Sequence, residues 1–207
     1  MADILLNLNC SEHAIYSKIL SGCAYIIKYG LNSPELFLRR VHQRQARRLR
    51  KKGVNINEPG KEYAVAENIL HNLKVLPSPL MPTNLYAKLR QLLDIYGDET
   101  RSKYLSEIFQ ETKPATLYVL QALLKTMHLL GTFERSWNCL CGKINGGNGL
   151  SATMVALPIT SYVMREKCST PGHWFVSWGQ QASDVEVVKI LIKHWQDLHP
   201  NSIIKPA

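Results

Sequence analysis

Helix and turn meet in the stretch VAENILHNLKVLPSPLMP, which runs from Val65 to Pro82. The surrounding segment, EYAVAENILHNLKVL from Glu62, has the apolar pattern of a helix. The two prolines of Leu-Pro-Ser-Pro-Leu end this helix, because a proline pushes the residue before it out of helical geometry. The sequence therefore predicts a helix that leads directly into a proline-rich turn at 76–80.

Two helices are predicted upstream of this stretch. Apolar residues recur on one helical face from the predicted N-cap Ser11 to Gly30, which stops the pattern. The residues Ser-Pro-Glu at 33–35 then supply an N-cap, a proline at the first helical position and an acid in the first turn. Because no helix breaker follows before Gly53, the second helix is predicted to continue to that glycine.

Helical spacing also dominates the remainder of the chain. A helix is predicted from Pro114, and another over 150–164 is predicted to be interrupted by Pro158. Other helical segments are predicted at 85–93, 104–109 and 184–198. With no internal repeat and no convincing strand, the sequence predicts an all-α fold of about eight helices.

Length and composition favour one domain. A chain of 207 residues with 45% hydrophobic content can bury a substantial core as one unit, whereas two smaller units would each be marginal. We therefore expect a single domain over 1–207, with its core at about 12–199. Five scattered cysteines favour a reducing environment, and neither a signal peptide nor a membrane span is recognised. We therefore expect a cytoplasmic protein, and a location at the membrane periphery is the alternative.

Positive charge is concentrated in LRRVHQRQARRLRKK, from Leu38 to Lys52, which holds eight basic residues and no acid. The formal net charge is +9, yet outside this stretch 17 basic residues stand against 16 acidic ones. The basic pI of the chain therefore reports one local patch. If the stretch is helical, only Val41 and Leu49 can face a core. The basic residues then on one face are Arg40, Arg44, Arg47, Arg48 and Lys51.

Four interpretations of this patch are open: a solvated face, a nucleic-acid or nuclear-import site, a site for anionic lipid headgroups, and a site for an acidic protein surface. Nucleic acid is not expected, because the patch lacks interleaved aromatic residues and a groove-fitting motif. Lipid headgroups require only the cluster of charge. Like charges four residues apart disfavour a helix by a few tenths of a kcal/mol each, so a partner or a tolerated solvated face must explain them.

No catalytic, metal or cofactor motif is recognised. Zinc sites usually separate paired cysteines by two to four residues, whereas Cys139 and Cys141 are separated by one. The glycine-rich segment GKINGGNG at 142–149 lacks the Lys-Ser/Thr of a P-loop and follows no strand. We therefore expect neither a bound metal nor a cofactor.

Five segments share their order and pattern with the segments of one known domain. They are YIIKYGLNSPELF at 25–37, the helix and turn at 65–80, PATLYVLQALL at 114–124, NGLSATMVALPITSYVM at 148–164 and VVKILIKHWQDL at 187–198. Together they resemble the RhoGAP domain, the all-helical module that accelerates GTP hydrolysis by Rho-family GTPases. The first segment resembles the helix and Gly-Leu turn that lead to the family's catalytic arginine. The fourth resembles its Asn-x-Met-Thr-x-x-Asn-Leu-Ala signature.

The family inserts an arginine finger into the nucleotide site of the GTPase, which is worth about 10³ to 10⁵ in rate. This arginine directly follows a Gly-Ile-Phe turn, and alignment of Phe37 with that turn places Leu38 at the finger position. Arg39 and Arg40 follow one and two positions later. The glycine that keeps this segment a loop in the family is replaced by Val41. We therefore expect a continuous helix where the family has its finger loop.

Other site positions of the family are partly kept. Leu70 stands at the position of the family's lysine, and Met154 stands at that of its signature asparagine, so neither offers the same polar contact. Lys74 keeps the basic character of the arginine before the Leu-Pro-x-Pro-Leu turn. The matching positions are Asn148, Ser151 and Ala152.

The resemblance implies a RhoGAP-like module that binds a Rho-family small GTPase with weak or no activating activity, a pseudo-GAP with a scaffolding or signalling role. On this interpretation the chain is a regulator of a GTPase at most, with no active site of its own. One alternative is an active domain that uses Arg39 or Arg40 as a shifted finger. Another is a module that binds anionic membranes through the basic stretch 39–52. The predicted partner-binding residues are Arg39, Arg40, Arg44, Arg47, Arg48, Lys74, Asn148 and Ser151.

Overall fold

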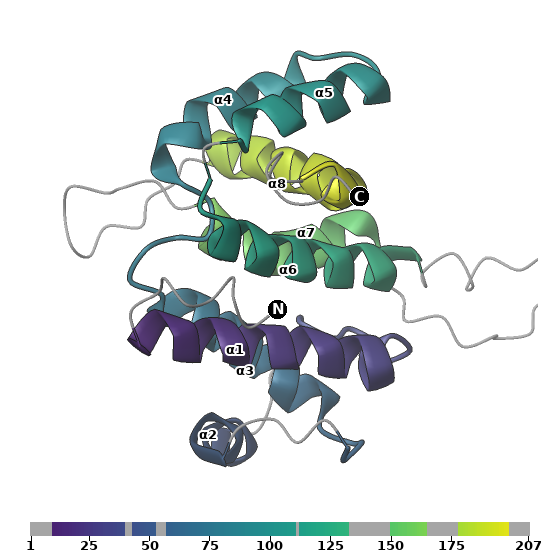
Figure 1. Ribbon diagram of the computed structural model, residues 1–207. Helices are drawn as coiled ribbons and strands as arrows, with labels where there is room; N and C mark the ends of the chain where they lie inside the picture. The colour runs from purple at the N-terminus through teal and green to yellow at the C-terminus, as the bar shows by residue number, and fades with distance from the viewer. Residues whose placement is uncertain are drawn as a thin grey trace, which may run out of the picture.

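All regular structure that the computed structural model describes is helical (Figure 1). The described residues are 10–39, 43–52, 57–110, 112–132, 150–164 and 178–198. The α-helices are α1 (Cys10–Tyr25), α2 (Gln43–Lys52), α3 (Glu62–Val75), α4 (Tyr86–Arg90), α5 (Asp98–Ile108), α6 (Pro114–Thr132), α7 (Ala152–Val163) and α8 (Trp178–Lys193). The all-α prediction is confirmed. The expected domain boundaries stay a prediction.

Short helical pieces adjoin these helices. The π-helical piece η2 (Ile26–Gly30) continues α1, and the 3-10 pieces η3 (Thr83–Leu85) and η4 (Gln91–Leu93) flank α4. A last piece, η6 (Trp195–Asp197), follows α8. Among the helices that the structure describes, none has the length and apolar character needed to cross a membrane.

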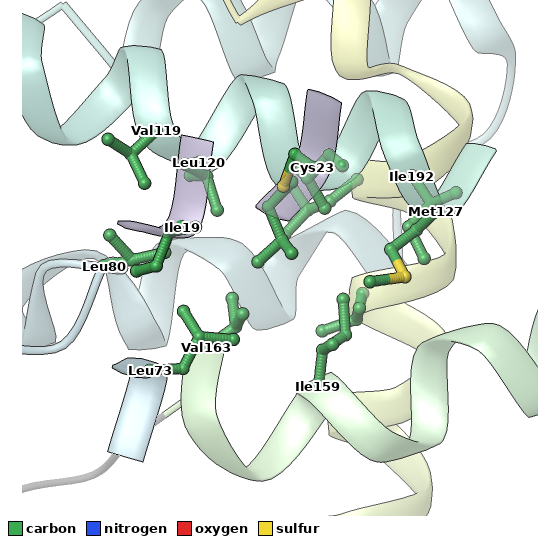
Figure 2. Close-up of a cluster of buried hydrophobic side chains, with 14 of the residues drawn as sticks. Ile19, Cys23, Leu73, Leu80, Val119, Leu120, Met127, Ile159, Val163 and Ile192 are labelled. Atoms are coloured by element: carbon green, nitrogen blue, oxygen red, sulfur yellow. The ribbon is translucent and has the colours of Figure 1, made fainter. Parts of the chain in front are cut away.

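The helices form a stack around α6 and α7 (Figure 1). Helix α1 packs against α3 and α6, while α7 packs against α3, α6 and α8. Helices α4 and α5 lie at one end of the stack, and α2 lies at the other end, where it packs on α3. Figure 2 shows the core between them, to which α1, α3, α6, α7 and α8 all contribute.

Close packing of α1 on α3 depends on a glycine. A Cβ atom added at Gly22 would lie 2.7 Å from Cγ1 of Ile69, closer than real Cβ contacts. The turn after α3 is fixed by its two leucines, because Leu76 and Leu80 are both buried. The predicted helix that ends in a proline-rich turn is therefore confirmed, and the apolar residues of the turn hold it in the core.

Helix α7 passes through Pro158 without the predicted interruption. Proline leaves the carbonyl group four residues earlier without its helical hydrogen bond. Here that carbonyl belongs to Met154, whose side chain is exposed, so this side of α7 faces solvent and water can bind the freed oxygen.

The predicted helix from Ser33 to Gly53 is wrong. Residues 31–39 form turns, and α2 begins only at Gln43. The start signal at 33–35 is local, whereas the fold requires the chain to turn back so that Leu36 is fully buried beside Gly30. Val41, on which the prediction also depended, lies outside the described residues.

Candidate functional site

The loop at 31–39 has a tight, defined backbone. The N–H of Ser33 donates to the Gly30 carbonyl at 3.0 Å, and the N–H groups of Leu38 and Arg39 both donate to the Glu35 carbonyl, at 2.9 and 3.0 Å. Glu35 and Phe37 have positive φ angles of 52° and 37°, which L residues rarely adopt. Each such residue costs of order 1–3 kcal/mol, so other contacts must hold the loop in this form.

Buried and half-buried side chains supply those contacts. Full burial of Leu36 contributes about 1.5–3 kcal/mol, and half-buried Phe37 also packs on the core. Tyr63, in the first turn of α3, donates its hydroxyl hydrogen to the carbonyl of Pro34 at 2.8 Å. The hydrophobic core and α3 therefore fix the loop from two sides.

Arg39 is exposed at the end of this loop and lies over Tyr63. Its guanidinium carbon is 5.8 Å from the centroid of the Tyr63 ring, within the range of a cation–π contact. Leu38, at the finger position of the resemblance, is 40% exposed. Arg40 lies outside the described residues. The loop thus presents one leucine and one arginine side by side to the solvent.

The outward face of α3 extends from this loop. Tyr63, Glu67, Leu70 and Lys74 follow one another at spacings of four, three and four residues, which places them on one face. All four are exposed or half-exposed, whereas α3 buries its other face. At about 1.5 Å per residue, the backbone from Tyr63 to Lys74 spans about 16 Å. Arg39 thus lies at one end of this face and Lys74 at the other.

The linker that leads into α3 is held by Tyr25, near the end of α1. The Tyr25 hydroxyl donates to the Glu58 carbonyl at 2.8 Å and accepts a hydrogen bond from the N–H of Lys61 at 3.0 Å. Burial is the main cause that raises the pKa of the Tyr25 phenol, so it remains a neutral donor. Sequence reasoning missed both Tyr25 and Tyr63, because nothing in the helical pattern distinguishes a tyrosine that bonds the backbone from one that only packs.

Helix α7 presents an exposed apolar surface near its start. Met154 and Leu157 are each 46% exposed and lie three residues apart on the helix. Ser151 caps α7, since its hydroxyl oxygen accepts a hydrogen bond from the N–H of Met154 at 3.2 Å. This predicted partner-binding residue thus has a structural role in the chain. Asn148 lies outside the described residues.

Three residues of the predicted basic face are described on α2. The side chains of Arg47, Arg48 and Lys51 are exposed, while Leu49 is buried as predicted. Arg44 lies within α2. Because α2 packs on α3, it lies beside the helix that carries the outward face described above.

Two other features lie apart from this site. An open groove of about 470 Å³ adjoins the proline-rich turn and the first turns of α1, at the end of α1 opposite to the loop. Within the described ranges, no group of histidine, cysteine or acidic side chains is arranged to hold a metal ion. The candidate segment with Cys139 and Cys141 and the glycine-rich segment at 142–149 are not among the described residues.

Comparisons with known proteins agree on the fold. The family model of the RhoGAP domain matches residues 18–167, a range that includes the loop, α3 and the start of α7. The crystal structure of the BH domain from GRAF, the GTPase regulator associated with focal adhesion kinase, has a TM-score of 0.69 and 12% identity, and the match covers 92% of this chain and 97% of that one. The crystal structure of human Rho GTPase activating protein 15 also has a TM-score of 0.69, with 11% identity, and the match covers 87% of this chain and 82% of that one. No curated protein sequence matches significantly.

The prediction that the chain is a regulator at most, with no active site of its own, is wrong. The matched family consists of domains that are generally GTPase-activating enzymes. That prediction relied on the absence of catalytic motifs, on Leu38 at the finger position and partly on a helix through the finger region, whereas the described part of this region is a loop.

Proposed function

This chain belongs to the RhoGAP family of Rho GTPase-regulating modules, and we propose that it is an active GTPase-activating domain in which Arg39 is the catalytic arginine. The observation that carries the proposal is the loop at 31–39, which presents the exposed Arg39 where the sequence alone predicts a helix. The pseudo-GAP interpretation depended partly on that helix and loses this support.

The proposed catalytic role of Arg39 is electrostatic stabilisation of the transition state. Charge develops on the oxygens of the transferring phosphoryl group, and a guanidinium placed there stabilises the transition state. Arg39 is one residue later than the family's finger, a displacement of about 3.8 Å along the backbone. A long, flexible arginine side chain on a turn can compensate for this displacement, whereas a helical position would fix its direction.

Partner binding is proposed to use the outward face of α3 together with α7. Arg39 and Lys74 supply positive charge at the two ends of the α3 face, and this charge favours an acidic surface on the GTPase. Leu70 is half-buried between them and offers no polar contact. Met154 is likewise apolar, so we expect an acceleration at or below the lower end of about 10³ to 10⁵.

The test is single-turnover GTP hydrolysis by a panel of Rho-family GTPases, with and without this chain. Arg39→Ala is expected to lower the maximal rate by about 10²-fold or more, a much larger effect than the loss of affinity for the GTP-analogue-loaded GTPase that follows from removing one charge of the binding face. Arg39→Lys is expected to be nearly as inactive, because lysine lacks the planar fork of arginine.

Two matched variants test the assignment of the finger. Arg40→Ala removes the neighbouring arginine and is expected to retain activity. Leu38→Arg restores the family's register at an exposed position and is expected to raise the rate. Tyr96→Arg adds the same charge at an exposed position between η4 and α5, away from the proposed partner surface, and is not expected to raise the rate. Loss of activity with Arg40→Ala but not with Arg39→Ala would move the finger to Arg40. Absence of acceleration across the panel would refute the proposed function.

A further inference from the structure

Three basic residues of α2 form an outward face, and one apolar residue among the described side chains of this helix lies behind it. Successive residues of a helix are rotated by about 100°, so Arg47, Arg48 and Lys51 fall within an arc of about 100°. Leu49 lies on the opposite side of the helix and is only 8% exposed. The three basic side chains are exposed. Helix α2 therefore packs on α3 and buries Leu49, while its three exposed basic side chains direct positive charge away from the molecule.

No acidic side chain in the described part of the chain pairs with these three residues. Ion pairs elsewhere in the described residues join Lys61 with Glu58, Arg90 with Asp184, Lys189 with Glu186 and Lys193 with Asp98. Arg47 and Lys51 are four residues apart, and Arg48 and Lys51 are three apart, so like charges repel along the helix. No acidic side chain among the described residues compensates this repulsion. An external anion would.

We propose that this face of α2, with Arg47, Arg48 and Lys51 at its centre, binds the headgroups of an anionic lipid bilayer. Helix α2 lies at the outer end of the stack and packs mainly on α3 (Figure 1), so it can approach a flat surface. The described exposed residues of α2 are all polar or charged, with Gln45 as the fourth.

A protein partner fits this face less well. Binding energy at protein interfaces is concentrated in aromatic and arginine side chains that fill desolvated pockets. The described outward face of α2 has no aromatic or apolar anchor, whereas a bilayer surface attracts a charge cluster without one. This proposal does not depend on the activity proposed for Arg39.

The experiment is cosedimentation of the full chain with two kinds of vesicle, pure phosphatidylcholine and phosphatidylcholine mixed with phosphatidylserine. Binding is expected only to the second, and it is expected to weaken as salt is raised, because the Debye length falls from about 8 Å at 0.15 M to about 3 Å at 1 M. Each basic residue near an anionic surface contributes about fivefold in affinity. The triple variant R47Q/R48Q/K51Q is therefore expected to lose on the order of a hundredfold.

A charge-matched variant provides the control. K18Q/K88Q/K103Q removes three exposed lysines from α1, α4 and α5, and it is expected to bind nearly as well as the parent chain. R47K/R48K keeps the charge of α2 and is expected to retain binding, and thermal unfolding followed by circular dichroism confirms that each variant is folded. If both triple variants lost vesicle affinity equally, the net charge of the chain and not the face of α2 would explain the binding, and the proposal would be overturned. Equal binding to vesicles with and without phosphatidylserine would also overturn the proposal. If R47Q/R48Q/K51Q then lost binding to a GTPase, the basic face of α2 would be assigned to a protein partner and not to lipid.

Discussion

Tyr63 joins the two parts of the candidate site through a single side chain. Its hydroxyl group holds the backbone of the loop at Pro34, and its ring lies under the guanidinium of Arg39. A hydrogen bond of this kind contributes about 1 kcal/mol net, and an exposed cation–π contact contributes about 0.5–1 kcal/mol. These amounts are comparable to the backbone strain at Glu35 and Phe37, so Tyr63 has a measurable share in fixing the loop.

We predict that Tyr63→Phe loosens the loop while the ring under Arg39 is kept. Trypsin is expected to cleave after Arg39 several times faster, because the Pro34 carbonyl loses its hydrogen bond. In single-turnover assays the maximal rate is expected to fall several-fold, with affinity for the GTPase unchanged. In an Arg39→Ala background the same change is expected to have no further effect on rate, which is the signature of a positioning residue.

Tyr104→Phe is the matched control for this prediction. The hydroxyl hydrogen of Tyr104 is shared between the backbone carbonyl of Lys88 at 3.0 Å and the side-chain oxygen of Gln91 at 2.6 Å, and Tyr104 lies on α5, away from the loop. We expect a similar loss of stability, about 1 kcal/mol, with no change in cleavage after Arg39. If both variants speed cleavage equally, the effect reports global stability and the role assigned to Tyr63 is wrong.

Glu35 offers a separate test of the strain in the loop. Its φ angle of 52° costs about 1–2 kcal/mol for an L residue, whereas glycine adopts it freely but loses about 0.5–1 kcal/mol of unfolded-state entropy. We predict that Glu35→Gly stabilises the chain by about 0.5–1 kcal/mol in urea unfolding. Glu67→Gly, in the middle of α3, is expected to destabilise by about 1 kcal/mol. A loss of stability from Glu35→Gly would contradict the left-handed conformation at this position.

The sequence alone could point to some single residues of the candidate site and not to others, and the functional roles assigned to them stay predictions. The sequence singled out Arg39 and Lys74, because their charge can be read from residue type and from the resemblance. Tyr63 was missed, because its role follows from where its hydroxyl group lies and not from its spacing. Ser151 was predicted for a partner, yet its oxygen caps α7, a use that a serine before an apolar run also predicts.

At the scale of elements, periodic segments were predicted well and the finger region was not. The apolar spacing of α1, α3 and α6 extends over several turns, so tertiary packing and local preference agree there. The Ser-Pro-Glu signal at 33–35 covers one turn only, and burial of Leu36 opposes it. Whether the helix start signal or the burial of Leu36 prevails depends on core residues that lie far away in the sequence, and a local sequence pattern does not include those residues.

The contact between α5 and α8 gives a prediction on pH. Lys193 donates a hydrogen bond to the Asp98 carboxylate at 2.5 Å, and His194 Nε2 lies 3.5 Å from the other carboxylate oxygen. The hydrogen bond from Lys193 is the main cause that lowers the pKa of Asp98 below its ordinary value near 3.8. Because the folded-state pKa is the lower one, the stabilisation is present above the unfolded-state pKa and is lost as pH falls through the folded-state pKa.

We therefore predict that Asp98→Asn lowers the urea midpoint at pH 7 and reduces its dependence on pH below about 4. The parent chain is expected to lose stability as the pH falls through this range, and the variant to lose less. Asp94→Asn is the matched control, because Asp94 is an exposed carboxylate of the preceding segment with no ion pair among the described residues. Identical pH profiles for the parent chain and Asp98→Asn would show that the pair with Lys193 does not stabilise the fold.

At the scale of the whole molecule, the order of helices was predictable and their mutual placement was not. Helical periodicity identifies which residues turn inward, but it does not say that α3 packs against α7, where Leu73 and Val163 belong to one core (Figure 2), or that α2 lies at one end of the stack (Figure 1). Those relations depend on contacts between distant segments. For this reason the basic face was visible in the sequence, while its position at the outer end of the stack required the structure.

Cys23 reports on the integrity of this assembly. It lies in the core between α1, α6 and their neighbours, 2% exposed, and burial raises the pKa of its thiol to about 12 despite a hydrogen bond with Thr126 (Figure 2). A thiol reagent attacks only the thiolate, so Cys23 is expected to react only when the whole core opens. Its labelling rate, read by mass spectrometry of the peptide that contains it, therefore measures global opening.

Gly22→Ala is predicted to increase that rate. The added Cβ would lie 2.7 Å from Cγ1 of Ile69, a fully buried, β-branched side chain of α3 that has little room to move. Overpacking of this kind costs about 1–3 kcal/mol, against a gain of up to about 1 kcal/mol from helix propensity. A net loss of about 1–2 kcal/mol corresponds to roughly 5- to 30-fold faster labelling of Cys23. Gly131→Ala, where no atom lies within 4 Å, is expected to slow labelling by a few-fold, so faster labelling in both variants would contradict the close packing of α1 on α3.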